Sequence, residues 1–336
     1  MKRKLFILTL WLFSGLSGPP LLFAQPSREV LTFAYAAISP PVLPLWIAAD
    51  KGFLAKEGID ARLVYVRGSP VLLSSMASGE VQAGYTAGTA VLSAVARGLD
   101  LQIIASISNK ITWDIVVRPE IINPVDVKGK IFGVNALGGT VWMSAMLGLE
   151  YLGLDPARDK IKLIALGDQT VLAQALETRN IDVTLLDKPL SISLEKKGFR
   201  ILTELAKVNI PFASTGLVFR RSFVAKKPEI VERSLRAIVR AMGYLFDQRN
   251  RSEVIAIMVQ RLGLDRSSAE VGYEPALGII DRKPYPTVEG LRNIQRFLSR
   301  FNPDISKVAV EEAVDMRFLE RLDKSGFIDE VYRTGG

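Results

Sequence analysis

The chain has 336 residues, of which 49% are apolar and 23% are charged, and this composition excludes a disordered polypeptide. A chain of this length usually divides into two lobes. The formal net charge is +8; without Lys2, Arg3 and Lys4, 40 basic residues remain against 35 acidic ones, a net charge of +5. This mild excess favours anionic ligands or surfaces. Because no basic run is interleaved with aromatic residues, we expect no nucleic-acid binding.

Cysteine and histidine are both absent from the sequence. Their absence excludes disulfides, a structural zinc site with thiolate or imidazole ligands, and catalysis by Ser-His-Asp or Cys-His groups. The acidic residues show no metal-loop spacing. We therefore predict no catalytic residue, no metal site and no cofactor, and we expect a binding protein rather than an enzyme.

Residues 1–24 have the features of a cleavable signal peptide. A basic segment, Met1–Lys4, precedes the apolar run Leu5–Phe13, and a cluster of glycine and proline then leads to Ala24. The alternative is a membrane anchor, but a spanning helix needs about 20 largely uninterrupted apolar residues. Because the chain has no cysteine for lipid attachment, we expect a free, exported protein in the periplasm.

From Val30 onward, short apolar runs alternate with amphipathic stretches. Helical patterns occupy Pro70–Ala77, Ala90–Arg97, Val141–Leu152 and Thr170–Thr178. Alternation of this kind indicates an α/β protein with parallel sheets and helices on both faces. The predicted strands are Leu31–Tyr35, Ala61–Val66, Ala83–Thr86, Gln102–Ile107, Asp114–Val117, Ile131–Val134, Ile161–Ala165, Val183–Leu186, Ile201–Leu205 and Gly216–Phe219.

The last third of the chain has a different pattern. From Pro228 to Phe327 the periodicity is almost entirely helical, and Pro228 suits the first position of a helix. We expect this helical C-terminal region to pack around the first lobe.

A weak internal repeat links the two halves. The segment from Ser75 to Gly84, SMASGEVQAG, resembles the segment from Ala175 to Thr184, ALETRNIDVT. Each combines a helix end, a polar turn and a new strand. Chance similarity of two βαβ units is the alternative to common ancestry, and on either interpretation both halves use the same supersecondary unit.

Three stretches carry a family resemblance. They are SPPVLPLWIAADKGFLAKEGIDARLV from Ser39, GSPVLLSSMASGEVQAGYTAGTAVLSAVARG from Gly68, and DVKGKIFGVNALGGTVWMSAMLGLEYLGLD from Asp126. Together they resemble the periplasmic substrate-binding proteins of sulfonate, taurine and nitrate ABC transporters, a family that includes proteins similar to the thiamine-pyrimidine synthases.

The resemblance implies a type II periplasmic-binding fold, in which two α/β lobes are joined by a hinge of two crossing strands. Lobe 1 would comprise residues 25–118 and 215–336, and lobe 2 residues 119–214. The hinge strands would lie near Trp113–Val117 and Gly216–Phe219. The implied function is capture of a small polar or anionic molecule between the lobes, by a monomer that delivers it to a permease at the inner membrane.

Two alternatives belong to other functional classes. One is an enzyme on the same fold that resembles the pyrimidine synthases, although those enzymes are expected to use histidine and cysteine, which this chain lacks. The other is a sensory module that presents its ligand to a receptor. The sequence does not separate the sensory role from transport.

Loops after the strands of lobe 1 hold the first binding candidates. Ser39 and Pro40 follow the first strand, and Trp46 lies in the apolar helix beyond; a helix cap and a core position are the alternative interpretations. Ser69 and Thr86 stand where helices begin, and free N–H groups there suit an anion. Ordinary capping explains these two residues equally well.

Lobe 2 provides the opposing candidates. Gly139 and Thr140 begin a helix as a compact N–H nest without dinucleotide or P-loop spacing. Asp187 either accepts a hydrogen bond from a ligand amine or caps the helix that follows it. The resemblance also places Thr215, at the second crossing, near the cleft.

Overall fold

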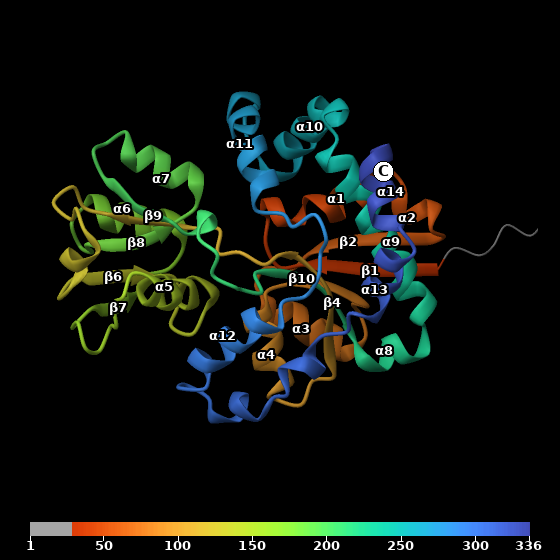
Figure 1. Ribbon diagram of the computed structural model, residues 1–336, viewed down its shortest axis with the longest axis horizontal. Coiled ribbons are helices and arrows are strands. Elements are labelled where there is room, and N and C mark those ends of the chain that lie inside the picture. The colour runs from red at the N-terminus through yellow and green to blue at the C-terminus, as the bar shows by residue number, and fades with distance from the viewer. Residues whose placement is uncertain (1–28) are drawn as a thin grey trace, which may run out of the picture.

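The computed structural model describes residues 29–336, so the predicted signal peptide, residues 1–24, lies outside the described residues. None of the helices within residues 29–336 combines the length and apolar character that a membrane crossing requires. Two five-stranded sheets form the centres of two lobes that lie side by side (Figure 1).

The sheet of lobe 1 has the strand order β2-β1-β3-β10-β4. Strands β1, β2 and β3 are parallel, whereas β10 is inserted antiparallel between β3 and β4. The strands are β1 (Glu29–Tyr35), β2 (Ile59–Tyr65), β3 (Ala83–Thr86), β4 (Leu101–Ser108) and β10 (Thr215–Arg220).

The sheet of lobe 2 repeats this plan with the order β7-β6-β8-β5-β9. Strands β6, β7 and β8 are parallel, and β5 runs antiparallel to β8 and β9. Each of the ten predicted strands is present, but both sheets are mixed rather than purely parallel. The strands are β5 (Asp114–Val117), β6 (Ile131–Val134), β7 (Lys162–Ala165), β8 (Val183–Leu186) and β9 (Arg200–Glu204).

The chain crosses between the lobes earlier than we predicted. Strand β5 was assigned to lobe 1, which was expected to extend to residue 118, but β5 pairs with β8 and β9 in the second sheet. All four of its residues are buried there. The predicted hinge strands are therefore sheet strands, and residues 109–113 and 205–214 make the crossings.

Helices cover both sheets. In lobe 1, short 3-10 helix η1 (Pro40–Val42) leads into α1 (Leu43–Asp50), followed by α2 (Phe53–Lys56), α3 (Ser69–Ser78) and α4 (Gly88–Val95). Lobe 2 contains α5 (Thr140–Tyr151), α6 (Gln169–Glu177) and α7 (Lys188–Glu195), with 3-10 turns η2 (Pro124–Val127) and η3 (Leu205–Lys207).

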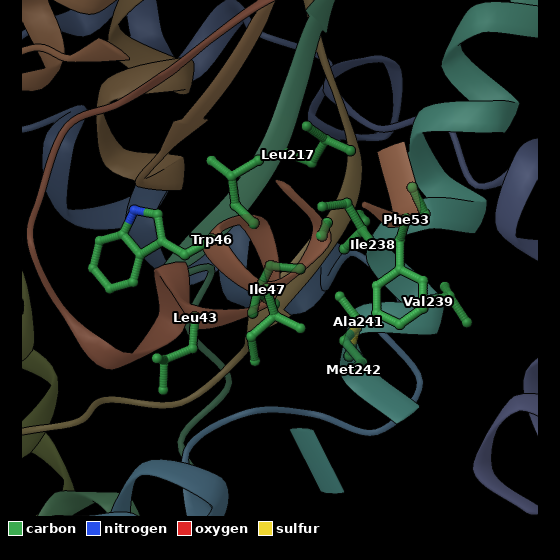
Figure 2. Packing of buried hydrophobic residues seen from close by; sticks show 14 of the residues in the cluster. Leu43, Trp46, Ile47, Phe53, Leu217, Ile238, Val239, Ala241 and Met242 are labelled. Atoms are coloured by element: carbon green, nitrogen blue, oxygen red, sulfur yellow. The ribbon is translucent and has the colours of Figure 1, made fainter. Parts of the chain in front are cut away.

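The C-terminal region is helical, and Pro228 begins its longest helix, as the sequence predicts. Figure 2 shows residues of α1, α2 and α9 packed together against Leu217 of β10. Helix α12, however, also packs on α5 of lobe 2, so this region does not pack around lobe 1 alone. The elements are α8 (Arg221–Lys226), α9 (Pro228–Phe246), η4 (Gln248–Asn250), α10 (Arg251–Leu262), α11 (Arg266–Gly278), α12 (Val288–Leu298), η5 (Pro303–Lys307), η6 (Val310–Ala313), α13 (Arg317–Lys324) and α14 (Phe327–Thr334).

The two segments of the weak repeat adopt the same structure. The side chain of Gln82 accepts a hydrogen bond from the Thr32 backbone N–H at 2.9 Å, and Asp182 accepts one from the Ile131 N–H at 2.8 Å. Gln82 and Asp182 occupy the same place in the two segments. Each lobe therefore ties the start of its third parallel strand to its first by the same side-chain contact.

Candidate functional site

The carboxyl ends of the parallel strands in both sheets point toward the boundary between the lobes. In Figure 1, β1 is drawn with its carboxyl end toward lobe 2. The hydroxyl oxygens of Thr89, in the first turn of α4, and Thr140, in the first turn of α5, are 3.1 Å apart. Ligands of open α/β sheets bind outside the carboxyl ends of strands, so this boundary is the candidate site.

The structure places the predicted lobe 1 residues at these strand ends. Thr86 is the last residue of β3 and is buried. Ser69 is the first residue of α3, and Ser39 precedes η1, which begins at Pro40. Neither Ser39 nor Ser69 caps its helix by a side-chain hydrogen bond.

The remaining candidates are in lobe 2 and at the second crossing. Gly139 precedes α5, and Thr140 is its first residue. Thr215 begins β10, half-buried, and pairs with Ser108 of β4. Among all nine candidates, Thr140 is the one with a side-chain hydrogen-bond contact to the other lobe, through Thr89. The loop Tyr85–Thr89 contains both Thr86 and Thr89, but only Thr86 was predicted as a site residue.

Trp46 is a core residue, as its alternative interpretation holds, but its nitrogen is unpartnered. The side chain is 1% exposed, and its ring meets Tyr35 edge-on with ring centres 5.7 Å apart. In Figure 2 the indole lies at the margin of the cluster, with its nitrogen pointing away from Leu43. No hydrogen-bond partner meets that nitrogen.

Three buried hydroxyls near these strand ends also lack a hydrogen-bond partner among residues 29–336. They are the hydroxyls of Tyr85, Thr86 and Ser108. A buried polar group without a hydrogen bond costs about 1–3 kcal/mol, so four such groups at one edge of a sheet indicate that something else supplies their partners. Burial also raises the pKa of Tyr85, which keeps its hydroxyl neutral.

Tyr85 and Ser108 were not among the predicted site residues. Tyr85 directly precedes Thr86 in the strand Ala83–Thr86, and its burial makes it resemble a core residue. Ser108 ends β4, one position beyond the predicted strand. A position at the end of a strand is what identifies such a residue as a candidate. The predicted strand ended at Ile107, so Ser108 was not recognised as a strand end.

The helix N-termini at the site fall into two classes. No side chain caps α3, α4 or α5. Aspartates cap the other two: Asp168 accepts from the N–H groups of Thr170 and Val171, and Asp187 accepts from that of Leu190 at 3.3 Å. Helix N-termini attract anions, and an aspartate already occupies that position in α6 and α7. The capping interpretation of Asp187 is therefore correct, whereas its contact with a ligand stays a prediction.

The charged side chains at the start of α7 are paired, whereas Arg67, which follows β2, is exposed. The Lys188 ammonium lies 3.2 Å from Asp114 and 2.6 Å from Glu204, and Ser191 donates to Asp114. Burial raises the pKa of Asp114 and of Asp187. With Lys188 neutralised by two carboxylates, the polar groups that remain for a ligand are mainly uncharged.

Two surface depressions lie away from the strand ends of lobe 1, and one of them is lined in part by Lys188 and Glu204. One of about 770 Å³ is on the flank of lobe 2 and is lined by residues of α5, α7 and β9, among them Tyr151 and Thr203. The other, of about 500 Å³, is lined by residues that include Arg221 and Val288. The four unpartnered polar atoms line neither depression and are themselves buried, so a ligand reaches them only if the structure opens. Within residues 29–336, no group of three or more acidic side chains is arranged to hold a metal ion.

Known proteins similar to this chain bind different ligands. Riboflavin-binding protein RibY of Chloroflexus aurantiacus is 23% identical over 65% of this chain and 63% of its own length, slightly under two thirds. The periplasmic aliphatic sulphonate binding protein SsuA of Escherichia coli has 19% identity and a TM-score of 0.71, covering 86% of this chain and 93% of that one.

The periplasmic nitrate-binding protein NrtA of Synechocystis PCC 6803 has 14% identity and a TM-score of 0.68, covering 91% of this chain and 90% of that one. Such likeness establishes the periplasmic-binding fold. The sequence model of the family described as "NMT1/THI5 like" matches residues 39–252, which is more than half of the chain. The chain therefore belongs to the NMT1/THI5-like family.

Proposed function

We propose that this protein is the solute-binding component of an ABC importer, exported to the periplasm by a cleavable signal peptide. It binds a small polar or anionic organic molecule between its lobes and delivers it to a permease at the inner membrane. The observation that carries this proposal is the set of four buried, unpartnered polar atoms at the strand ends of lobe 1, on Trp46, Tyr85, Thr86 and Ser108.

The family and the fold support transport. E. coli SsuA and NrtA are periplasmic binding proteins, for sulphonate and for nitrate, and RibY binds riboflavin. These ligands differ in size and charge, so membership of the family leaves the ligand of this chain open. We expect a monomer, as the resemblance implies.

The site favours binding without chemistry. The groups at the strand ends are hydroxyls, an indole N–H and backbone N–H groups, and the sequence contains no histidine or cysteine. Such groups donate hydrogen bonds but do not transfer protons near neutral pH. We therefore propose that a bound molecule is released unchanged.

The ligand contacts we propose come from both lobes. Ser39, Pro40, Trp46, Ser69, Thr86 and Thr215 would contact it from lobe 1, and Gly139, Thr140 and Asp187 from lobe 2. One small molecule touches both sets only when the lobes close around it, so binding and closure are coupled.

A thermal-shift panel on the mature protein tests this function. The panel consists of taurine, butanesulfonate, nitrate, aromatic acids and pyrimidines. At a concentration about 100 times Kd, a ligand should stabilise the native state by about 2.7 kcal/mol, a rise of several degrees in Tm. Small-angle scattering should show compaction with the same ligand, and mass spectrometry should recover that ligand unchanged.

Variants locate the site. Thr140→Ala and Ser69→Ala should each weaken the response to the ligand that binds, whereas Ser193→Ala, on an exposed part of α7, should not. If Thr140→Ala and Ser69→Ala both leave affinity unchanged, the proposed site is wrong.

Mass spectrometry of the periplasmic fraction tests export, for which we expect a mature chain beginning at Gln25. A chain that keeps Met1 or stays in the cytoplasm contradicts export.

A further inference from the structure

Three tyrosines cross the sheet of lobe 1 in one row. Tyr35 of β1 is paired in register with Tyr65 of β2 on one side and with Tyr85 of β3 on the other. Paired residues of neighbouring strands have side chains on the same face, so the three side chains lie on one face at the carboxyl ends of these strands. We call Tyr65, Tyr35 and Tyr85 the tyrosine row.

The row forms an aromatic surface with one open end. The ring centres of Tyr35 and Tyr65 are 5.6 Å apart, and Trp46 meets Tyr35 edge-on from α1. Tyr85 is buried at the inner end, whereas Tyr65 at the outer end is 40% exposed. An exposed tyrosine ring that continues a buried aromatic group presents a π-face for stacking.

Exposed apolar side chains gather on the loops that face this boundary. In lobe 1, Ile38 follows β1 and Val71 lies in the first turn of α3. In lobe 2, Leu137 precedes α5 and Val171 lies in the first turn of α6. All four are exposed in this structure. Exposed apolar residues grouped at the loops of two facing lobes indicate a partner with apolar surface.

The unpartnered hydroxyls and indole nitrogen at the carboxyl ends of this sheet are neutral. The indole nitrogen of Trp46 and the hydroxyls of Tyr85, Thr86 and Ser108 have no partner. The nearby cation Lys188 is held by Asp114 and Glu204. This set suits ring nitrogens, carbonyls and hydroxyls of a ligand, and the exposed Arg67, two positions after Tyr65, provides a cation for a single negative charge.

From this arrangement we infer that the ligand is a flat aromatic or heteroaromatic molecule with uncharged or singly charged polar substituents. Its ring would stack on Tyr65 and the tyrosine row, and its polar edge would meet the two unpartnered donors next to Tyr35, the Trp46 nitrogen and the Tyr85 hydroxyl. This inference rests on the proposed solute-binding function and narrows it to one class of ligand. A small inorganic anion or an aliphatic sulfonate would leave the exposed ring of Tyr65 without a contact.

The test compares matched pairs of probes on the mature protein by isothermal titration. Benzenesulfonate is paired with cyclohexanesulfonate, which has the same charge and a similar size but no π-face. Riboflavin and a 4-aminopyrimidine are added to the aromatic probes, and taurine and nitrate are added to the non-aromatic probes. We expect the aromatic member of the matched pair to bind at least about five-fold more tightly, as stacking on more than one ring implies.

Substitutions at Tyr65 test whether its aromatic ring is responsible for the tighter binding of the aromatic probes. Tyr65→Leu keeps apolar area but removes the π-face and should weaken the aromatic probes about 2- to 10-fold. Tyr65→Phe keeps the ring and should restore affinity to within about two-fold. Tyr151→Leu, at an exposed tyrosine on the flank of lobe 2, is the control and should change nothing. Because Tyr65 is partly exposed, these variants should keep the fold, which circular dichroism checks.

The outcomes separate the two proposals. If cyclohexanesulfonate, taurine or nitrate binds as tightly as the aromatic probes, or if Tyr65→Leu leaves aromatic binding unchanged, the ligand class is wrong while the solute-binding function stands. Tight aromatic binding without compaction in scattering supports the ligand class and contradicts lobe closure. If no probe of either set binds, the ligand class is overturned.

Discussion

Two buried threonines show how a single hydroxyl can distinguish a site from a core. The Thr184 hydroxyl on β8 donates to the Gly133 carbonyl at 2.9 Å, whereas the Thr86 hydroxyl on β3 has no partner. Both side chains are buried. The difference predicts that the Thr86 hydroxyl, unlike that of Thr184, contributes nothing to stability.

Replacing each threonine by valine tests this difference. Thr184→Val should lower the free energy of unfolding by about 1 kcal/mol, because it removes a buried hydrogen bond. Thr86→Val should leave stability unchanged or raise it, because it removes an unpartnered polar atom, and should weaken ligand binding. Urea unfolding without ligand, followed by titration with ligand, measures both effects. Equal destabilisation by the two substitutions would mean that Thr86 has a structural partner.

For single residues, the sequence predicted where candidate hydroxyls lie better than it predicted which of them lack a hydrogen-bond partner. It identified Thr86 and Thr140 at strand ends and helix starts, because hydroxyl residues there follow recognisable apolar runs. It did not identify Tyr85, Ser108 or Thr89. Whether a buried hydroxyl has a partner depends on atoms from distant segments, and no local pattern reports that.

At the scale of elements, α6 and α7 form a matched pair because each begins with an aspartate cap. Loss of an N-cap costs about 1 kcal/mol, so Asp168→Ala and Asp187→Ala should each lower stability by about that amount. Only Asp187→Ala should also weaken ligand binding, since Asp187 is a proposed contact and Asp168 is not. Chemical denaturation and ligand titration of both variants measure this. Unchanged affinity in Asp187→Ala would show that the residue is a cap alone.

The turn that connects α5 to β7 should make stability sensitive to acid. The Asp159 carboxylate accepts hydrogen bonds from Arg158 at 2.6 Å and from the Asp155 N–H at 2.8 Å, and lies 3.1 Å from the Lys128 ammonium. These contacts, Arg158 foremost, hold the pKa of Asp159 well below its usual range. The resulting stabilisation is complete above the ordinary aspartate pKa of about 4 and disappears as the pH falls below it.

Asp159→Asn should therefore be less stable than the wild type at pH 7, and the difference should shrink as the pH falls from about 5 to 3. Urea unfolding across this range measures the difference. Asp60→Asn, at an exposed position on β2, is the control and should show little difference at any pH. A difference for Asp159→Asn that stays constant with pH would exclude the carboxylate charge as its source.

The sequence predicted every strand, but it did not predict that β5 and β10 are antiparallel to their neighbours or that β5 belongs to lobe 2. Apolar runs such as Asp114–Val117 mark a buried strand whatever its direction. The direction and sheet of β5 depend on pairing with β8 and β9, some 70 to 90 positions away in the chain. For that reason the lobe boundary was placed after β5 and the sheets were expected to be parallel.

At the scale of the whole molecule, α12 joins the lobes outside the strand ends. The ring of Trp142 on α5 lies edge-on to Phe301, with ring centres 4.8 Å apart, and Arg296 on α12 is 2.9 Å from Glu150. Any change in the angle between the lobes must alter these contacts. They therefore contribute to the balance between open and closed arrangements.

Phe301→Ala should shift that balance. We expect a larger radius of gyration without ligand, the wild-type radius with saturating ligand, and an affinity about 2- to 10-fold lower, because the ligand must then replace one of the contacts that favour closure. Small-angle scattering and titration measure these quantities. Val271→Ala, at an exposed position on α11, is the control. An unchanged radius without ligand would show that α12 does not restrain the lobes.

Because β10 is inserted between β3 and β4, the two lobes should complete their sheets at different times during folding. Lobe 2 draws its whole sheet from residues 114–204. Within residues 29–336, β4 of lobe 1 has β10 as its only strand neighbour in the sheet, and β10 begins at Thr215. A chain emerging amino end first across a membrane would hold β4 unpaired until lobe 2 had passed. Contacts between distant segments form late, so the second lobe in the sequence should mature first. Pulse-labelled hydrogen exchange during refolding should protect the amides of β6 and β8 before those of β4, and the reverse order would contradict this.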